Sequence, residues 1–411
     1  MIKVVKTPMQ LEMILNEYRD LFTKPSFNSF CDISSAISVC DKNKTVSNLS
    51  DTMAKNRDGT KSRSSYNWFF SDAVWDENEV AQRSADLFIR AMNLVEGKRI
   101  LLIIDDTFNE KEGQCTDGVG KFYDHCKDAY IMGNNFVTSV IQANGIFIPH
   151  KAKMYIKKSD MDEDFRTKIE IAYRDIIEPL KIPEGLDVYI VFDSWWFSAD
   201  FITKCLKLKY QVVCKIKSDK RVWINKDMSF QVRELAKQID GIYYRKVSIQ
   251  VRGKKKVYYA IEKEIALDKI GKVKLVISKK KRESAANYFI STNTSLSLEE
   301  ILSIYEDRWN IETAHREANQ KLGFKDYQLR GKRSIERFIQ MVFSVWTAIV
   351  LYELNNPPIE RSQKERTIGE MIDSIKAQAF IDAFIYVLKY FNLPVPDRGL
   401  LYLIKEQGYK I

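Results

Sequence analysis

The first predicted strand of the chain reads Arg99-Ile-Leu-Leu-Ile-Ile104, and Asp105-Asp106-Thr107 follow it directly. A short apolar run bounded by polar residues is typical of a buried strand. A second β-rich run, Leu186 to Phe192, ends at Asp193. Strand ends in mixed α/β sheets open onto the crevice in which ligands bind. We therefore expect Asp105 and Asp193 to lie near each other at one edge of a sheet.

Two carboxylates at such an edge repel each other unless a cation lies between them. Hard cations such as Mg²⁺ take oxygen ligands, which Asp and Glu supply. Asp106 competes with Asp105 for this role, because adjacent strand residues face opposite sides of a sheet. Each of these aspartates, taken alone, would also suit a loop or a helix cap.

A third acidic residue, Glu312, lies on a predicted helix that begins at the capping box Ser297-Leu-Glu-Glu300 and stops at Gly323. Tyr305, Arg308 and Glu312 are spaced i, i+3 and i+7, which puts them on one helical face. Arg308 could hold a phosphate with its planar fork of donors, and Tyr305 could donate its hydroxyl to the same phosphate. The alternative is an exposed helix with an internal Arg–Glu pair.

The composition favours a polyanionic partner. The 411 residues carry 65 Lys and Arg against 55 Asp and Glu, which gives a net charge of +10. Nucleic acid is the commonest such partner, although a basic surface kept for solubility is the alternative. The longest apolar stretch, Met341 to Leu354, is too short to span a bilayer and predicts a buried helix. With no secretory signal at Met1, we expect a cytoplasmic protein that acts at the nucleoid and not at a membrane.

Changes of periodicity along the chain predict five regions. Residues 97–216 and 288–332 form a mixed α/β core in two parts, and the second part carries the Glu312 helix. A hairpin is expected in the first part at Asn144-Gly145. The remaining regions are a helical N-terminal DNA-binding region (1–96), a β-rich insertion (217–287) and a helical C-terminal region (333–411).

Two groups of basic residues are candidates for DNA contacts. The first lies at a turn between helices of the N-terminal region, where a helix–turn–helix contacting phosphates and a solvated helical surface are both possible. The second lies near a hairpin tip in the insertion, where lysines could contact phosphates or protect an edge strand. The first group comprises Lys55, Arg57, Lys61 and Arg63, and the second comprises Lys254, Lys255 and Lys256.

These motifs together resemble a known family. Tyr305-x2-Arg308-x3-Glu312 resembles the Y-(2)-R-(3)-E-(6)-K signature of the IS4-like (IS4/IS701-type) DDE transposases. Asp105-Asp-Thr107-x3-Lys111-x-Gly113 resembles their first-Asp motif, and Val191-Phe-Asp193 resembles their second. The resemblance covers roughly residues 45 to 350. It implies an RNase H-like mixed sheet with flanking helices, interrupted by a β-rich insertion between the second Asp and the Glu.

The resemblance also implies roles. Asp105, Asp193 and Glu312 would be the catalytic residues and would hold two Mg²⁺ ions, for which Mn²⁺ can substitute. Tyr305 and Arg308 would contact a phosphate near the element end. The implied activity is metal-dependent cleavage at transposon ends and strand transfer into target DNA, by a homodimer on double-stranded DNA. The alternatives are an RNase H-like nuclease without strand transfer, a catalytically relaxed DNA-binding protein descended from a transposase, and an unrelated metal-dependent hydrolase.

One residue departs from the family signature. The lysine seven residues after the glutamate is Asn319 in this chain. Arg316, one helical turn from Glu312, is the better substitute cation, and Asn319 could still hydrogen-bond a phosphate more weakly.

Tryptophans lie near the inferred site as well. Trp195 and Trp196 follow Asp193, and Trp309 follows Arg308. Such residues could stack a flipped base, as related enzymes that cut through a hairpin intermediate do, or they could pack in the core.

Overall fold

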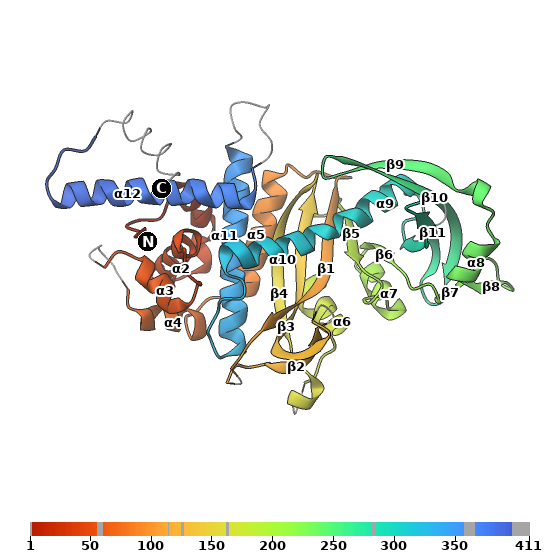
Figure 1. Ribbon diagram of the computed structural model, residues 1–411, viewed down its shortest axis with the longest axis horizontal. Helices are drawn as coiled ribbons and strands as arrows, with labels where there is room; N and C mark the ends of the chain where they lie inside the picture. The colour runs from red at the N-terminus through yellow and green to blue at the C-terminus, as the bar shows by residue number, and fades with distance from the viewer. Residues whose placement is uncertain are drawn as a thin grey trace.

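A single sheet of twelve strands runs from the middle of the molecule to one end (Figure 1). The structure is a computed structural model that describes residues 2–55, 61–113, 115–124, 127–161, 164–281, 284–356 and 366–396. Five strands in the spatial order β4–β3–β1–β5–β6 form the core of this sheet. Their bounds are β4 (Ile146–Tyr155), β3 (Ala129–Ala143), β1 (Arg99–Glu110), β5 (Asp187–Phe192) and β6 (Gln211–Lys215).

The pairing within these five strands is mixed. β1 pairs antiparallel with β3 and parallel with β5, and β5 pairs parallel with β6. This order and pairing are those of an RNase H-like sheet, so the predicted fold class is confirmed. The turn between β3 and β4 is the predicted hairpin, since Asn144 and Gly145 both have positive φ, 50° and 82°.

The predicted β-rich insertion extends this same sheet. β12 (Asn287–Ser291) pairs antiparallel with β6, β11 (Gly271–Lys279) pairs with β12, and β10 (Lys254–Leu267) pairs with β11. The sheet is therefore continuous from the core into the insertion. The remaining elements of the insertion are β7 (Arg221–Trp223), β8 (Ser229–Gln231), α8 (Val232–Gln238) and β9 (Arg245–Val251).

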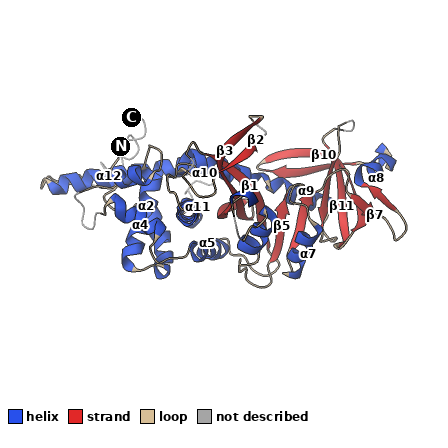
Figure 2. Ribbon diagram, turned by 90° about the horizontal axis from the view of Figure 1, so that it is seen from below, coloured by secondary structure: helices blue, strands red, loops and turns tan. Residues whose placement is uncertain are grey.

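Helices gather at the opposite end of the molecule, as Figure 2 shows. At their centre is α11 (Lys332–Asn355), which contacts α1, α2, α4, α5 and β4. Among the described residues it is the one helix long and apolar enough to cross a bilayer, and its apolar stretch is entirely buried inside the protein. The surrounding helices are α1 (Met9–Leu15), α2 (Lys24–Val39), α3 (Val46–Thr52), α4 (Arg63–Ser71), α5 (Glu77–Ala91) and α12 (Ile368–Tyr390).

The basic turn of the N-terminal region is only partly described. α3 and α4 flank it, but residues 56–60, including Arg57, lie outside the described residues. Lys61 Nζ donates to Ser29 Oγ (2.6 Å), and Arg63 Nη1 donates to Ser47 Oγ (3.2 Å). Whether this turn contacts DNA stays a prediction.

One local prediction was wrong. Asp105 does not end its strand, because β1 continues to Glu110 and its polar half pairs with β3 down to Gly133. Between β4 and β5 lie a short α6 (Lys168–Ile171) and a π-helical turn, Ala172–Ile177. The Glu312 helix was predicted correctly, except that it consists of α9 (Leu298–Asp307) and α10 (Trp309–Leu322), which meet at Arg308.

Candidate active site

Asp105 lies on β1, and Asp193 directly follows the neighbouring strand β5. Ile103 of β1 pairs with Val191 of β5, and two further residues along each parallel chain lead to the two aspartates. Because side chains alternate along a strand, both face the same side of the sheet. Burial raises the pKa of Asp105 to about 6, with Arg308 opposing this shift and Asp106 and Asp193 adding to it. The negative charge of Asp193 is therefore close enough to raise the pKa of Asp105.

Arg308 joins the first aspartate to the glutamate. Its Nη1 donates to Asp105 Oδ2 (2.9 Å), and its Nη2 donates to Glu312 Oε1 (2.6 Å). The predicted pair between Arg308 and Glu312 exists, but it includes Asp105, a residue 203 positions away from Arg308. The two carboxylates therefore converge on one guanidinium.

Asp106 faces the other way. Its Oδ2 accepts from Lys168 Nζ (2.6 Å) and from Asn135 Nδ2 (3.3 Å). Asp106 thus has its own cationic partner on the opposite face of β1, whereas Asp105 shares Arg308 with Glu312. This geometry favours Asp105 over Asp106 as the member of the carboxylate group.

Tyr305 lies beside this group. Its ring packs on Phe289, with 4.5 Å between the centroids, and Arg308 lies 6.0 Å from the Tyr305 centroid. Burial raises the pKa of Tyr305 to about 12, and the positive charge of Arg308 opposes this shift. Tyr305 is therefore a neutral donor next to the guanidinium at ordinary pH.

Helix α10 is fastened to β3 on both sides of Glu312. Asn310 Nδ2 donates to Gln142 Oε1 (2.7 Å), and His315 Nε2 lies 2.8 Å from Thr138 Oγ1. Sequence reasoning missed both contacts, because a polar residue inside a long strand gives no periodic signal. A signal for His315 was nevertheless present, since it lies three residues after Glu312 and hence on a neighbouring part of the same helix.

Two of the three tryptophans are accessible. Trp195 is 53% exposed and Trp309 is 46% exposed, whereas Trp196 is fully buried and belongs to the core. A cation lies near each accessible ring: Lys168 Nζ is 5.4 Å from the Trp195 centroid, and the Arg252 guanidinium is 5.9 Å from the Trp309 centroid. Arg252 was not among the predicted residues.

The lysine-rich hairpin reaches the junction of α9 and α10. Lys256 Nζ donates to Glu306 Oε2 (2.5 Å), and Tyr258 donates its hydroxyl to Glu306 Oε1 (2.6 Å). Lys254 and Lys255 are exposed nearer the tip. Of the three predicted lysines, Lys256 is thus engaged by the protein itself, and the other two are open to solvent.

Arg316 and Asn319 do not join the carboxylate group through any contact among the described residues. Arg316 is exposed, and its Nη2 is 4.0 Å from Glu317 Oε1. Asn319 Oδ1 is buried and makes no hydrogen bond to the described residues. Their predicted contacts with DNA stay predictions.

The carboxylate group has the chemistry that a divalent cation requires but is arranged around Arg308. Among the residues that the structure describes, no three His, Cys, Asp or Glu side chains are grouped closely enough to hold one metal ion. Asp105 and Glu312 are nevertheless hard oxygen donors that already bind a cation together. The donor set therefore fits Mg²⁺ if the guanidinium leaves.

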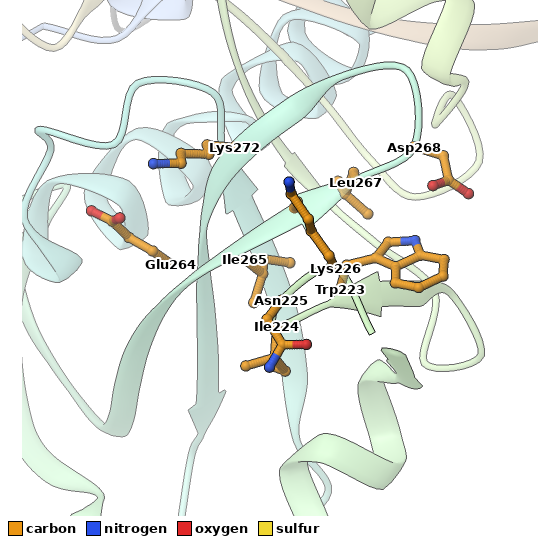
Figure 3. Close-up of a pocket in the computed structure, with 10 residues that line it drawn as sticks. Trp223, Ile224, Asn225, Lys226, Glu264, Ile265, Leu267, Asp268 and Lys272 are labelled. Atoms are coloured by element: carbon orange, nitrogen blue, oxygen red, sulfur yellow. The ribbon is translucent and has the colours of Figure 1, made fainter. Parts of the chain in front are cut away.

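Two pockets lie elsewhere in the molecule. One of about 600 Å³ lies in the insertion, where Trp223 and Lys226 face the turn between β10 and β11 (Figure 3). Another, of about 420 Å³, is lined by the β3–β4 turn, α10, α11 and the start of α12. Neither of these two contains Asp105, Asp193 or Glu312. Figure 1 shows α9 and α10 crossing one face of the sheet, and Arg308 at their junction binds Asp105 and Glu312 there.

A comparison with protein families identifies the chain. A DDE transposase family model, described as "Archaeal putative transposase ISC1217", matches residues 72–354, more than two thirds of the chain. The chain belongs to this family. The match supports a DDE transposase in general and not the IS4-like group in particular. A search of curated proteins finds no match. The matched residues of this transposase family member include all three candidate carboxylates and the insertion.

Proposed function

We propose that this protein is an active transposase that cuts DNA at the ends of a mobile element and joins the freed ends to target DNA. Asp105, Asp193 and Glu312 are its catalytic residues. The observation that carries the proposal is the ion-paired group in which Arg308 draws Asp105 and Glu312 together, with Asp193 beside Asp105 in the parallel register. The family match gives this group its chemical context.

The three carboxylates would hold two Mg²⁺ ions, or Mn²⁺ in their place. Three negative charges against the single positive charge of Arg308 leave a net negative site, which suits divalent cations. When bound, two such ions supply an activated water and stabilise the leaving 3′ oxygen. Asp105 and Asp193 are held at their places by β1 and β5, and Glu312 is held by α10.

Arg308 links DNA binding to the release of the carboxylates. A phosphate offers a guanidinium the same kind of bidentate acceptor as a carboxylate. When a DNA phosphate binds the guanidinium of Arg308, the carboxylate oxygens of Asp105 and Glu312 become free to bind a metal ion. Tyr305, which lies beside Arg308, can donate its hydroxyl to the same phosphate.

Exposed rings and cations around the group would hold the DNA. Trp195 and Trp309 can each stack an unpaired base, which is worth about 1–3 kcal/mol per base. Lys254, Lys255 and Arg316 are exposed cations that can contact phosphates, and the amide nitrogen of Asn319 can donate more weakly. Excision through a hairpin intermediate would use the stacking positions.

Finer features of the proposal rest on the sequence pattern. The spacing of Tyr305, Arg308 and Glu312 favours the IS4-like group within the DDE transposases. Synapsis of two element ends requires a homodimer on double-stranded DNA, acting in the cytoplasm at the nucleoid. The basic charge of +10 supports the DNA partner.

A cleavage and strand-transfer assay tests the proposal. The substrate is DNA carrying the sequences that flank this gene, incubated with Mg²⁺ or Mn²⁺ and either the wild type or the Asp193→Asn variant. Asp187→Asn is the matched control, because Asp187 is exposed at the start of β5, the strand that precedes Asp193. We expect metal-dependent 3′-OH ends and joined products from the wild type and the control, and neither from Asp193→Asn.

The alternatives give different results in the same assay. Cleavage without joined products would establish the nuclease without strand transfer. DNA binding without cleavage in either metal would establish the relaxed DNA-binding protein, and Asn319→Lys would then test whether the family lysine restores activity. Unchanged cleavage by Asp193→Asn would overturn the assignment of the second carboxylate.

A further inference from the structure

A chain of hydrogen bonds runs from β1 through β3 to α10 beneath the carboxylate group. The hydroxyl of Thr138 donates to the backbone carbonyl of Asp105 (3.1 Å), and His315 Nε2 lies 2.8 Å from the same hydroxyl oxygen. Thr138 is buried, so water does not compete for these bonds. These bonds join the backbone of Asp105 to the helix that carries Glu312.

The direction of these bonds identifies the tautomer of His315. A threonine hydroxyl has one proton, and Thr138 gives it to the Asp105 carbonyl. His315 must therefore donate from Nε2 to the oxygen of Thr138. Burial lowers the pKa of His315 to about 4, so the ring is neutral at pH 7 and carries its single proton on Nε2.

A second hydrogen bond completes the attachment. Asn310 donates to Gln142 (2.7 Å), and Gln142 lies on the same face of β3 as Thr138, four residues further along. Glu312 lies between Asn310 and His315 on α10. Two hydrogen bonds to buried residues of one strand therefore fasten the helix on either side of Glu312, and the one at Thr138 continues directly to Asp105.

The need for such an attachment follows from the charges. In the structure Arg308 holds Asp105 and Glu312 together by ion pairs. In the proposed function Arg308 turns to a DNA phosphate, after which the carboxylates repel each other until cations bind. The bonds through Thr138 and His315 involve neutral groups, so they persist when Arg308 leaves.

We propose that Thr138 and His315 are positioning residues that hold Glu312 at the correct distance from Asp105 for both to bind a divalent cation. This inference rests on the proposed function, because it assigns a role within the same site. Neither residue touches the DNA or the cation in this scheme. Both act by fixing α10 on β3.

Paired variants separate the hydrogen bonds from the bulk of the side chains. Thr138→Val removes the hydroxyl at almost constant volume, and Thr138→Ser keeps it. His315→Leu removes the donor, and His315→Gln keeps a donor close to the position of Nε2. Thr347→Val is the control, because Thr347 is also fully buried and, among the described residues, its hydroxyl bonds its own helix at Phe343.

The first measurement is the affinity of the full chain for Mn²⁺, determined by electron paramagnetic resonance. The Mn²⁺ concentration needed for half-maximal cleavage is measured alongside it, at saturating DNA. We expect Thr138→Val and His315→Leu to weaken Mn²⁺ binding about tenfold, the low end of the range for groups that orient metal ligands. The concentration for half-maximal cleavage rises equally, and DNA affinity is unchanged. Thr138→Ser, His315→Gln and Thr347→Val stay near the wild type.

The second measurement is independent of metal and activity. The chain has three histidines, so the nitrogen NMR spectrum of protein labelled at histidine is simple. We expect His315 to be the neutral Nε2–H tautomer at pH 7 and its resonances to move in Thr138→Val. An Nδ1–H tautomer or a charged ring at pH 7 would overturn the inference.

Failure of the inference is distinguishable from failure of the proposed function. If the wild type binds Mn²⁺ and cuts DNA, unchanged Mn²⁺ affinity in Thr138→Val and His315→Leu overturns the inference alone. If the wild type neither binds Mn²⁺ nor cuts DNA, the proposed function falls and the inference falls with it.

Discussion

Two clusters of charged residues lie on opposite faces of the core sheet. The carboxylate cluster, Asp105, Asp193, Glu312 and Arg308, lies on the face that α9 and α10 cross. The structural cluster lies on the other face, between β4, α5 and α11, and its ion pairs are 3.2–3.5 Å long. Its members are Glu77, Lys153, Glu336 and Arg337.

The two clusters differ in charge balance. The structural cluster has two acids and two bases, whereas the carboxylate cluster has three acids and one base. Burial lowers the pKa of Lys153, but Glu336 and Glu77 outweigh this effect and hold it above its ordinary value. Burial instead raises the pKa of Asp105 to about 6, and Arg308 does not compensate. Buried charges kept for stability are paired, and an unbalanced group marks a site at which a cation is expected.

The largest expected effect is on activity. Glu312→Gln keeps the shape of the side chain but removes the charge, so we expect cleavage to fall at least about a thousandfold, which corresponds to about 4 kcal/mol in the activation barrier. The measurement is the initial rate of cleavage with Mg²⁺. Glu299→Gln is the control, because Glu299 lies in the first turn of α9, half-buried and paired with Arg245 in the insertion. A Glu312→Gln rate within tenfold of the wild type would show that the carboxylate cluster is not catalytic.

The structural cluster should respond in stability and not in activity. Lys153→Met fills a similar volume but leaves Glu77 and Glu336 without their shared cation. We expect the free energy of unfolding to fall by about 3–5 kcal/mol, the cost of breaking a buried ion pair. Urea denaturation measures this, with exposed Lys158→Met as the control. A loss below about 1 kcal/mol would mean that Arg337 alone neutralises both acids.

Asp105→Asn should stabilise the protein at neutral pH. The folded pKa of Asp105, about 6, lies above its ordinary value of 3.8, so the folded state binds more protons between these values. Stability therefore falls as pH rises through this window, and the ionised carboxylate costs about 2–3 kcal/mol at pH 7. The variant removes this cost. We expect urea denaturation to show the gain at pH 7 and its decline toward pH 4, while destabilisation at pH 7 would contradict it.

The smallest expected effect concerns the hairpin tip. Lys254→Ala and Lys255→Ala should each weaken DNA binding by about 1 kcal/mol and reduce the slope of log affinity against log salt by about 1. Binding of labelled DNA over a range of salt concentrations measures both quantities. Lys246→Ala, exposed on the same hairpin and away from its tip, is the control. An equal effect of all three variants would show a diffuse basic surface in place of a contact.

The parts of the site that sequence could predict are those with local signals. Asp193 follows a short apolar strand, and Tyr305, Arg308 and Glu312 share a helical face, so each was recognisable from its neighbours. The meeting of Arg308 with Asp105 depends on how α9 and α10 cross the sheet, and neither the local patterns nor the family resemblance suggested it.

The parts that sequence could not predict depend on distant pairing. β1 continues through Asp106 and Glu110 because β3 supplies its hydrogen bonds, which overrides the weak strand preference of polar residues. Helix α2 (Lys24–Val39) lies in the predicted helical region 1–96, but its bounds were not predicted because its five serines hide its apolar face. The contact of Thr138 with His315 needs both the register of β3 and the position of α10.

The insertion is attached to the core twice, once by the pairing of β11 with β12, which itself pairs with β6, and once by the contacts of Arg252 and Lys256 with Glu306 of α9. An insertion attached at two places moves together with the core and does not swing independently of it. A displacement of the hairpin tip would move α9, which leads into the helix of Glu312, together with β6, the neighbour of the strand that precedes Asp193. DNA bound against this tip would thus shift the residues of the carboxylate cluster together.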